Sequence, residues 1–113
     1  MAYDEELAHR VRALLADERG VTEKRMFGGL AFLVDAKMAV AVSREGGLLV
    51  RADPEQLDRL LTRAGARVCV MRGRQMAGWL RVDDNVLRTK RQLESWVTRA
   101  VSYARSLPTN RSR

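Results

Sequence analysis

The residues of this sequence with the clearest chemical potential are its arginines and lysines, whose side chains can contact the phosphates of a nucleic acid. Residues 67–113 contain 11 basic and 3 acidic side chains, whereas residues 1–66 contain 10 basic and 11 acidic ones. Because clustered cations create a long-range positive potential, this asymmetry predicts a surface for an anionic partner, and an Arg-rich composition without a binding role is the alternative. The candidate nucleic-acid contacts are Arg72, Arg74, Arg81, Arg88, Lys90, Arg91 and Arg99.

A catalytic group of residues is not recognisable in the sequence. A nucleophilic serine needs a base within hydrogen-bonding reach, and His9 is the only histidine. The apolar residues of 4–19 recur at helical spacing away from His9, so we expect His9 to face water. Asp83 and Asp84 could bind a divalent ion, but adjacent acids between a strand and a helix more often form turns. We therefore expect no enzymatic activity, no catalytic or metal-binding residue and no cofactor.

The glycine pair Gly28-Gly29 raises the question of a phosphate-binding loop. Such a loop presents backbone N–H groups at the start of a helix, usually before a Lys-Ser or Lys-Thr pair, whereas an apolar strand pattern follows here. The pair therefore predicts a turn or a bulge.

Cys69 is the single cysteine of the chain and lies within an apolar strand pattern. It cannot form an internal disulfide, and one cysteine with one histidine is too few for a structural zinc site. No neighbouring histidine or helix start suggests a lowered pKa, so we expect a buried, unreactive thiol.

The elements that position these residues follow from the spacing of apolar side chains. Helical spacing over residues 4–19 and 89–107, and an Asp53-Pro54 start signal for a helix over 53–64, predict three helices. Alternation from residue 24 to residue 50 predicts a meander of three or four antiparallel strands, with one or two further strands over 67–71 and 76–83. The predicted fold class is α+β, a two-layer sandwich of an antiparallel sheet and helices in the order α-β-β-β(-β)-α-β-α.

The size of the chain fits one domain. Its 113 residues can bury a single core, so we expect one domain over residues 1–107 and a flexible C-terminal tail over 108–113. No apolar run approaches the roughly 20 residues that cross a bilayer, and the N-terminal segment is acidic, unlike a signal peptide. These features predict a cytoplasmic protein that does not contact a membrane.

Two segments resemble one known family. Residues 25–42, which begin Arg-Met-Phe-Gly-Gly, and residues 76–82, Met-Ala-Gly-Trp-Leu-Arg-Val, resemble the signature segments of the TfoX (Sxy) N-terminal-domain family. The resemblance extends over residues 4 to about 106 and implies a two-layer domain similar to type III secretion chaperone-like folds. Ala36 departs from the family, which usually has Gly in that turn, so the turn is of another type or its strain is tolerated. The residues that carry the resemblance are Met26, Phe27, Gly28, Gly29, Lys37, Met38, Gly78 and Trp79.

The resemblance also implies a function. Described family members are bacterial regulators of natural competence, thought to act at promoters with a cyclic-AMP receptor protein, and they carry a second, C-terminal domain that we do not recognise in residues 1–113. For this chain it implies a non-enzymatic regulatory or adaptor module that binds a protein partner through an exposed apolar or strand-edge surface, with a homodimer as one form of that contact. Direct nucleic-acid binding by the Arg-rich half is the alternative. A small-molecule pocket beside Trp79 or Trp96 is a third.

Overall fold

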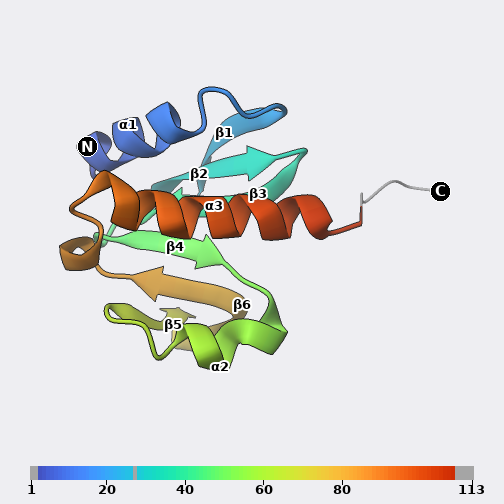
Figure 1. The fold of residues 1–113 in the computed structure, drawn as a ribbon. Coiled ribbons are helices and arrows are strands. Elements are labelled where there is room, and N and C mark those ends of the chain that lie inside the picture. The colour runs from blue at the N-terminus through green and yellow to red at the C-terminus, as the bar shows by residue number, and fades with distance from the viewer. Residues whose placement is uncertain (1–2, 27, 109–113) are drawn as a thin grey trace.

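The structure is a two-layer α+β domain in which one face of a six-stranded antiparallel sheet is covered by helices (Figure 1). It is a computed structural model that describes residues 3–26 and 28–108. The order of the strands in the sheet is β1-β2-β3-β4-β6-β5, so β1 and β5 form its edges. The predicted fold class is confirmed. The elements are α1 (Glu5–Leu14), β1 (Val21–Met26), β2 (Gly29–Val34), β3 (Lys37–Val42), β4 (Leu48–Arg51), α2 (Leu57–Leu60), β5 (Ala66–Met71), β6 (Arg74–Val82) and α3 (Lys90–Ser106).

The long helix α3 lies across the sheet and is fixed at its start by a capping box (Figure 1). The Thr89 hydroxyl accepts from the Gln92 N–H at 3.0 Å, and the Gln92 side chain accepts from the Thr89 N–H at the same distance. These bonds satisfy N–H groups that have no partner within the helix. The predicted apolar stripe of α3 is buried against the sheet, and it consists of Leu93, Trp96, Val97, Ala100, Val101 and Ala104.

The helix α1 begins at Asp4, whose carboxylate accepts from the N–H groups of Glu6 and Leu7. Its buried residues, Leu7, Ala8 and Val11, join the core that α3 forms with the sheet. His9 is exposed, as the helical spacing predicts. The two helices thus cover one face of the sheet with a single apolar layer.

The second predicted helix is shorter than expected. Asp53 caps the start as predicted by accepting from the Glu55 N–H at 2.9 Å, but residues 54–56 form a 3-10 turn and α2 ends at Leu60. The segment after α2 turns back to enter β5. In this segment the Thr62 hydroxyl donates to the Arg59 carbonyl, a local bond that competes with continued helix.

The number of strands before and after α2 was open in the sequence. The meander before α2 has four strands, and its first strand, β1, begins at Val21 although its side chains lack apolar alternation. Between α2 and α3 there are two strands, β5 and β6, where the predicted order had one.

The turn between β2 and β3 resolves the question that Ala36 raises. Val34 pairs with Lys37, and the two intervening residues have positive φ angles, 52° at Asp35 and 68° at Ala36. Positive φ at both central positions is the type I′ geometry that suits a two-residue hairpin. The turn therefore has the shape of a regular two-residue hairpin, and Ala36 adopts a left-handed conformation that is strained for a residue with a β-carbon.

Candidate functional site

The second face of the sheet carries its own apolar cluster, to which no helix of the described chain contributes. Successive residues along a strand point to opposite faces of the sheet. The residues next to those of the main core therefore meet on the face away from the helices. The centre consists of small or medium side chains that are buried, namely Ala31, Ala41, Leu49 and Cys69. Around them lie the half-buried side chains of Met26, Leu33, Met38, Met76 and Trp79.

This cluster is chemically suited to contact another macromolecule. Large apolar side chains remain partly in water there, although the opposite face of the same sheet is covered by α1 and α3. Three of the five surrounding residues are methionines, whose flexible side chains adapt to differently shaped partners. We refer to these nine residues as the second face.

Burial at the centre of the second face keeps the cysteine inert. Cys69 is 1% exposed, and removal from water raises the pKa of its thiol above the ordinary value. The thiol is therefore protonated at neutral pH, which confirms the predicted burial and disfavours nucleophilic use.

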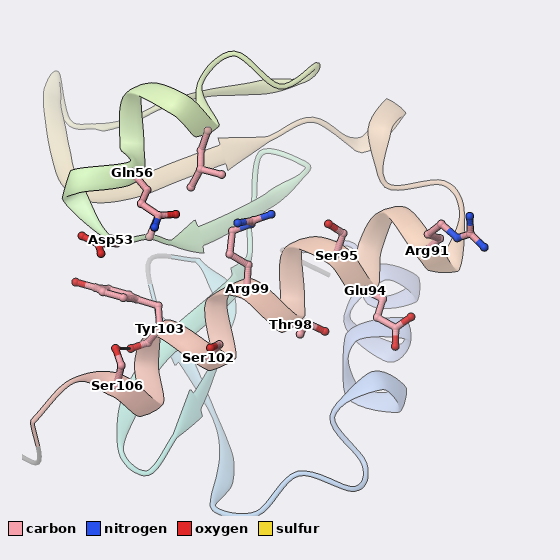
Figure 2. Close-up of a pocket in the computed structure, with 12 residues that line it drawn as sticks. Asp53, Gln56, Arg91, Glu94, Ser95, Thr98, Arg99, Ser102, Tyr103 and Ser106 are labelled. Carbon is pink, nitrogen blue, oxygen red and sulfur yellow. Dashed lines mark hydrogen bonds between the residues drawn. The ribbon is translucent and has the colours of Figure 1, made fainter.

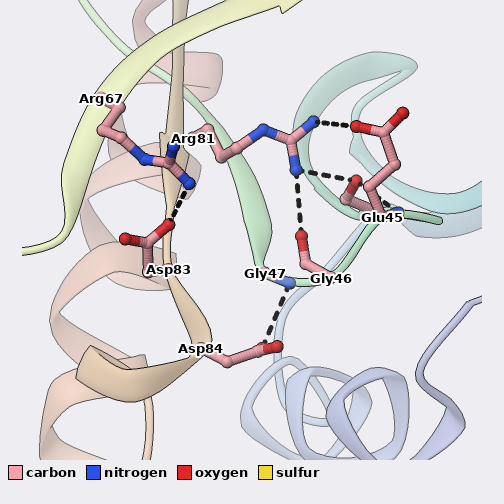
Figure 3. A network of polar contacts seen from close by, with 8 residues as sticks. Glu45, Gly46, Gly47, Arg67, Arg81, Asp83 and Asp84 are labelled. Carbon is pink, nitrogen blue, oxygen red and sulfur yellow. Dashed lines mark hydrogen bonds and ion pairs between the residues drawn. The ribbon is translucent and has the colours of Figure 1, made fainter.

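Arg81 closes one end of the second face through a fixed set of hydrogen bonds (Figure 3). Its Nη1 donates to the Ser43 hydroxyl and to the Gly46 carbonyl, both at 3.0 Å, and its Nη2 lies 3.4 Å from the Glu45 carboxylate. The Arg81 side chain is only 14% exposed, whereas that of Glu45 is 80% exposed. Arg81 therefore holds the β3–β4 loop in place and has little capacity left for a ligand.

The acids after β6 complete this network as turn residues. Asp84 accepts from the Gly47 N–H at 3.1 Å, and Asp83 forms an ion pair with Arg67 of β5 (Figure 3). Both carboxylates are occupied by protein donors. Among residues 3–26 and 28–108, no group of three or more His, Cys, Asp or Glu side chains could hold a metal ion.

A basic hollow of about 600 Å³ adjoins this network at the edge of the second face. The side chains of Arg44 and Arg72 line it, and neither makes a hydrogen bond or ion pair with another described residue. The hollow therefore presents two cations that an anionic group of a partner can reach. Its lining comes from three loops and two strands: Gly28, Ser43, Arg44, Glu45, Val70, Arg72 and Arg81.

The other face of the molecule has a groove of about 730 Å³ between α3 and residues 52–60 (Figure 2). Arg99 and Tyr103 project from α3 toward Gln56 and Asp53, and the Nε atom of Arg99 is buried without a hydrogen-bond partner among the described residues. Neither tryptophan lines this groove. Trp96 lies in the main core, with the Arg63 guanidinium 4.9 Å from its ring centre, and Trp79 belongs to the second face.

The candidate nucleic-acid contacts fall into two groups. Arg72, Arg74 and Arg81 lie on the β5–β6 hairpin. The others, Arg88, Lys90, Arg91 and Arg99, lie on α3 or just before it, and α3 packs on the face opposite Arg81. The structure therefore does not bring the seven cations together on one surface.

The residues that carry the family resemblance have different structural roles. Met26, Met38 and Trp79 all lie on the second face. The Lys37 ammonium donates to the Leu107 carbonyl at 2.7 Å and so ties β3 to the end of α3. Phe27 lies outside the described residues.

The signature glycines shape the backbone, as a turn or bulge requires. Gly28 has a φ of 77° in the β1–β2 turn, and Gly29 opens β2, where the Val42 carbonyl leaves no room for a side chain. Gly78 has a φ of 81° within β6, and its carbonyl accepts from the Ala52 N–H at 2.8 Å. The predicted turn is confirmed, and no helix follows it to form a phosphate loop.

The sequence predicts an exposed apolar or strand-edge surface, but it does not locate that surface on the second face or at the edge strand β5. A usable signal was present, because β2 and β3 read as nearly continuous apolar runs, Gly-Leu-Ala-Phe-Leu-Val and Lys-Met-Ala-Val-Ala-Val. Continuous runs are typical of strands that are buried on both faces. They therefore indicate a second apolar cluster in addition to the one beneath the helices.

These features define a two-layer α+β domain with one sheet face that is covered by helices and one to which no described helix contributes. The chain matches the family model of the TfoX N-terminal domain over residues 13–104, and it belongs to that family. Comparison with curated proteins and with solved structures finds no match. Within the described residues, the helices are too short or too polar to cross a membrane.

Proposed function

We propose that this chain is a non-enzymatic regulatory or adaptor module that binds a protein partner through the second face of its sheet. The observation that carries the proposal is the partly buried cluster of three methionines, a leucine and a tryptophan to which no described helix contributes. Three of the family signature residues, Met26, Met38 and Trp79, belong to this cluster. The position of these signature residues on the second face fits a family whose described members act together with another protein.

The chemistry of the surface favours a partner with apolar side chains and carboxylates. The apolar part of such a partner would cover the methionines and Trp79, because their burial is the main source of favourable free energy. Its carboxylates would meet Arg44 and Arg72 in the basic hollow beside the face. Charge complementarity of this kind speeds association and selects among partners.

Nucleic-acid binding is the competing proposal, and it is supported by the net charge of +7. A duplex is contacted by cations that follow its backbone along one continuous surface. Here Arg72, Arg74 and Arg81 lie on the β5–β6 hairpin and the other four cations lie on α3 or just before it, and Arg81 lies on the face of the sheet opposite α3. Arg81 is already occupied by Ser43, Gly46 and Glu45. We therefore place a protein partner first and use DNA as a separate measurement.

Site-specific photo-crosslinking in the native host tests the proposal. A photoreactive phenylalanine analogue replaces Trp79 on the second face in one variant and Thr98, an exposed residue of α3, in the control. We expect a discrete protein adduct from position 79 that is absent from position 98. The adduct should disappear when Leu33→Lys is added, because a charge within the contact surface opposes its burial.

Two results would count against this function. Equal adducts from positions 79 and 98 would show that the second face is not the contact surface, and so would an adduct that survives Leu33→Lys. In parallel, labelled duplex DNA is titrated at low and physiological salt. Binding that persists at physiological salt and weakens in an Arg88→Ala, Lys90→Ala, Arg91→Ala variant would favour the nucleic-acid proposal instead.

A further inference from the structure

The two edge strands of the sheet differ sharply in character. The edge strand β1 exposes Thr22, Glu23, Lys24 and Arg25, and charged side chains of this kind protect an edge from pairing with another chain. The other edge strand, β5, exposes Val68 and Val70, which are 37% and 49% accessible. They are the exposed large apolar side chains of the described residues. Only one edge is therefore chemically open to an added strand.

The backbone of β5 is also suited to accept a strand. It pairs with β6 on one side and is the last strand of the sheet on the other. Residues 66–71 contain no proline, so every residue on the free side retains its N–H donor and carbonyl acceptor. The pairing of β5 with β6 shifts register between Val68 and Val70, so an extended segment along β5 can satisfy these groups by sheet hydrogen bonds on either side of that shift.

The charges around β5 distinguish between a second copy of this chain and a different partner. Arg67 lies in the strand, Arg72 and Arg74 lie at its hairpin end, and Arg44 lies in the hollow that Val70 lines. The nearby acids are already used, because Asp83 pairs with Arg67 and Glu45 with Arg81. In an antiparallel pair of two β5 strands, the Arg72 end of each copy would approach the Arg67–Asp83 pair of the other, where the carboxylate is already engaged. A second copy would therefore bring no unpaired carboxylate to Arg72, whereas an acidic segment would, so the charges favour the acidic segment.

We propose that β5 accepts an extended, acidic segment of the partner protein as an additional edge strand. Apolar side chains of that segment would pack beside Val68 and Val70, and its carboxylates would meet Arg72 and Arg44, which are not paired with another described residue. The proposal rests on the function proposed above, because it names how the partner of the second face is recognised. Val70 lines the basic hollow, so an added strand at β5 lies next to the surface where the rest of the partner docks.

A synthetic peptide can test this recognition without knowledge of the natural partner. The probe is a short fluorescein-labelled peptide of alternating glutamate and valine, and its anisotropy is followed as the full chain is added. One control replaces every glutamate by lysine, and another replaces the central valine by proline, which removes a backbone donor and fixes φ. We expect saturable binding of the acidic peptide and at least roughly tenfold weaker binding of each control, a difference that anisotropy resolves readily.

The edge that the peptide occupies is identified by variants and by hydrogen exchange. Val70→Asp places a repelling carboxylate on β5, and Thr22→Asp places the same group on the exposed face of β1 as the matched control. We expect roughly tenfold weaker binding for Val70→Asp and little change for Thr22→Asp. The amides of residues 66–71 should gain protection from exchange when the peptide is bound, while those of residues 21–26 should not.

Several results would overturn the strand-addition proposal. Protection at β1, equal binding of the proline peptide, or equal loss in both Asp variants would each do so. Sedimentation that shows a dimer, converted to monomer by Val70→Asp, would assign this edge to a second copy.

If the acidic peptide does not bind while the crosslink from position 79 is specific, only strand addition is wrong and the proposed function stands. If the crosslink also fails, the proposed function fails with it.

Discussion

The carbonyl oxygen of Val42 occupies the space into which a side chain at Gly29 would project. Gly29 opens β2 and Val42 ends β3, so the two neighbouring strands approach closely at this point. A β-carbon there cannot be accommodated by rotating a flexible side chain, because the obstacle is backbone. The adjacent strands must separate or shift to admit it.

Gly29→Ala is therefore expected to destabilise the fold by about 3 kcal/mol, at the upper end of the cost of overpacking a closely packed interior. Gly73→Ala is the matched control, because Gly73 has a φ of 76° and a β-carbon added there would meet no other atom within 4 Å. It should cost only about 1 kcal/mol, the strain of a left-handed conformation. Urea unfolding measures both free energies. Equal losses would show that the Val42 carbonyl yields easily.

Ala36→Gly is expected to stabilise the protein by about 1 kcal/mol, because Ala36 has a φ of 68° in the β2–β3 turn. Glycine adopts this conformation without the clash that a β-carbon causes. Ala13→Gly in the exposed part of α1 serves as the control and should destabilise by about 1 kcal/mol. The shift of the urea midpoint tests both. A loss of stability in Ala36→Gly would show that the turn gains more from a restricted unfolded chain than it loses to strain.

The sequence predicts part of the main core correctly, because the spacing of apolar residues fixes the face of an element on which they lie. Apolar side chains at helical spacing in α3 must point to one face, so Leu93, Trp96 and Val97 are assigned correctly from spacing alone, whereas the nearly continuous apolar runs of β2 and β3 do not show which side chains face the helices. The turn at Asp35-Ala36 was located because two apolar runs flank it. Its type could not be chosen, since alanine gives no signal for positive φ.

Other features depend on contacts between segments that are distant in the sequence. The strand β1 lacks apolar alternation because it is an edge strand, and pairing with β2 rather than burial holds it in place. The early end of α2 follows from the return of the chain to β5. The basic hollow joins Arg44 to Arg72, which come from different loops. The spacing of apolar residues along one segment does not show which distant segments contact one another in the fold.

Glu23→Gln should lower stability slightly at neutral pH and not at low pH. The Arg12 guanidinium donates to both oxygens of Glu23, at 2.6 and 2.9 Å, and these hydrogen bonds lower the pKa of Glu23 below its ordinary value. A group whose pKa is lower in the folded state stabilises the fold above its unfolded pKa, and the contribution is lost as the pH falls through the folded pKa. Both side chains are about a third or more exposed, so the effect is small.

Thermal unfolding of the wild type and of Glu23→Gln from pH 7 down to pH 3 measures this dependence. We expect the difference between their melting temperatures to shrink as the pH falls below about 4.3, the ordinary pKa of a glutamate, and to vanish once Glu23 is protonated. Glu55→Gln is the control, since Glu55 is exposed and has no ion pair within the described residues. A difference that grows at low pH would contradict the role of the Arg12–Glu23 pair.

Arg99→Met is expected to stabilise the protein, although it removes a charge from the surface groove of α3. The Nε atom of Arg99 is buried and has no hydrogen-bond partner among the described residues, and an unsatisfied buried donor carries a desolvation cost. Methionine keeps most of the packing of the aliphatic stem and removes the donor. The expected gain is about 1 kcal/mol by urea unfolding.

Arg91→Met, at an exposed position near the start of the same helix, should change stability by less than about 0.5 kcal/mol. A loss of stability in Arg99→Met but not in Arg91→Met would show that the guanidinium of Arg99 makes a favourable interaction with groups lining the groove, such as Gln56 or Tyr103.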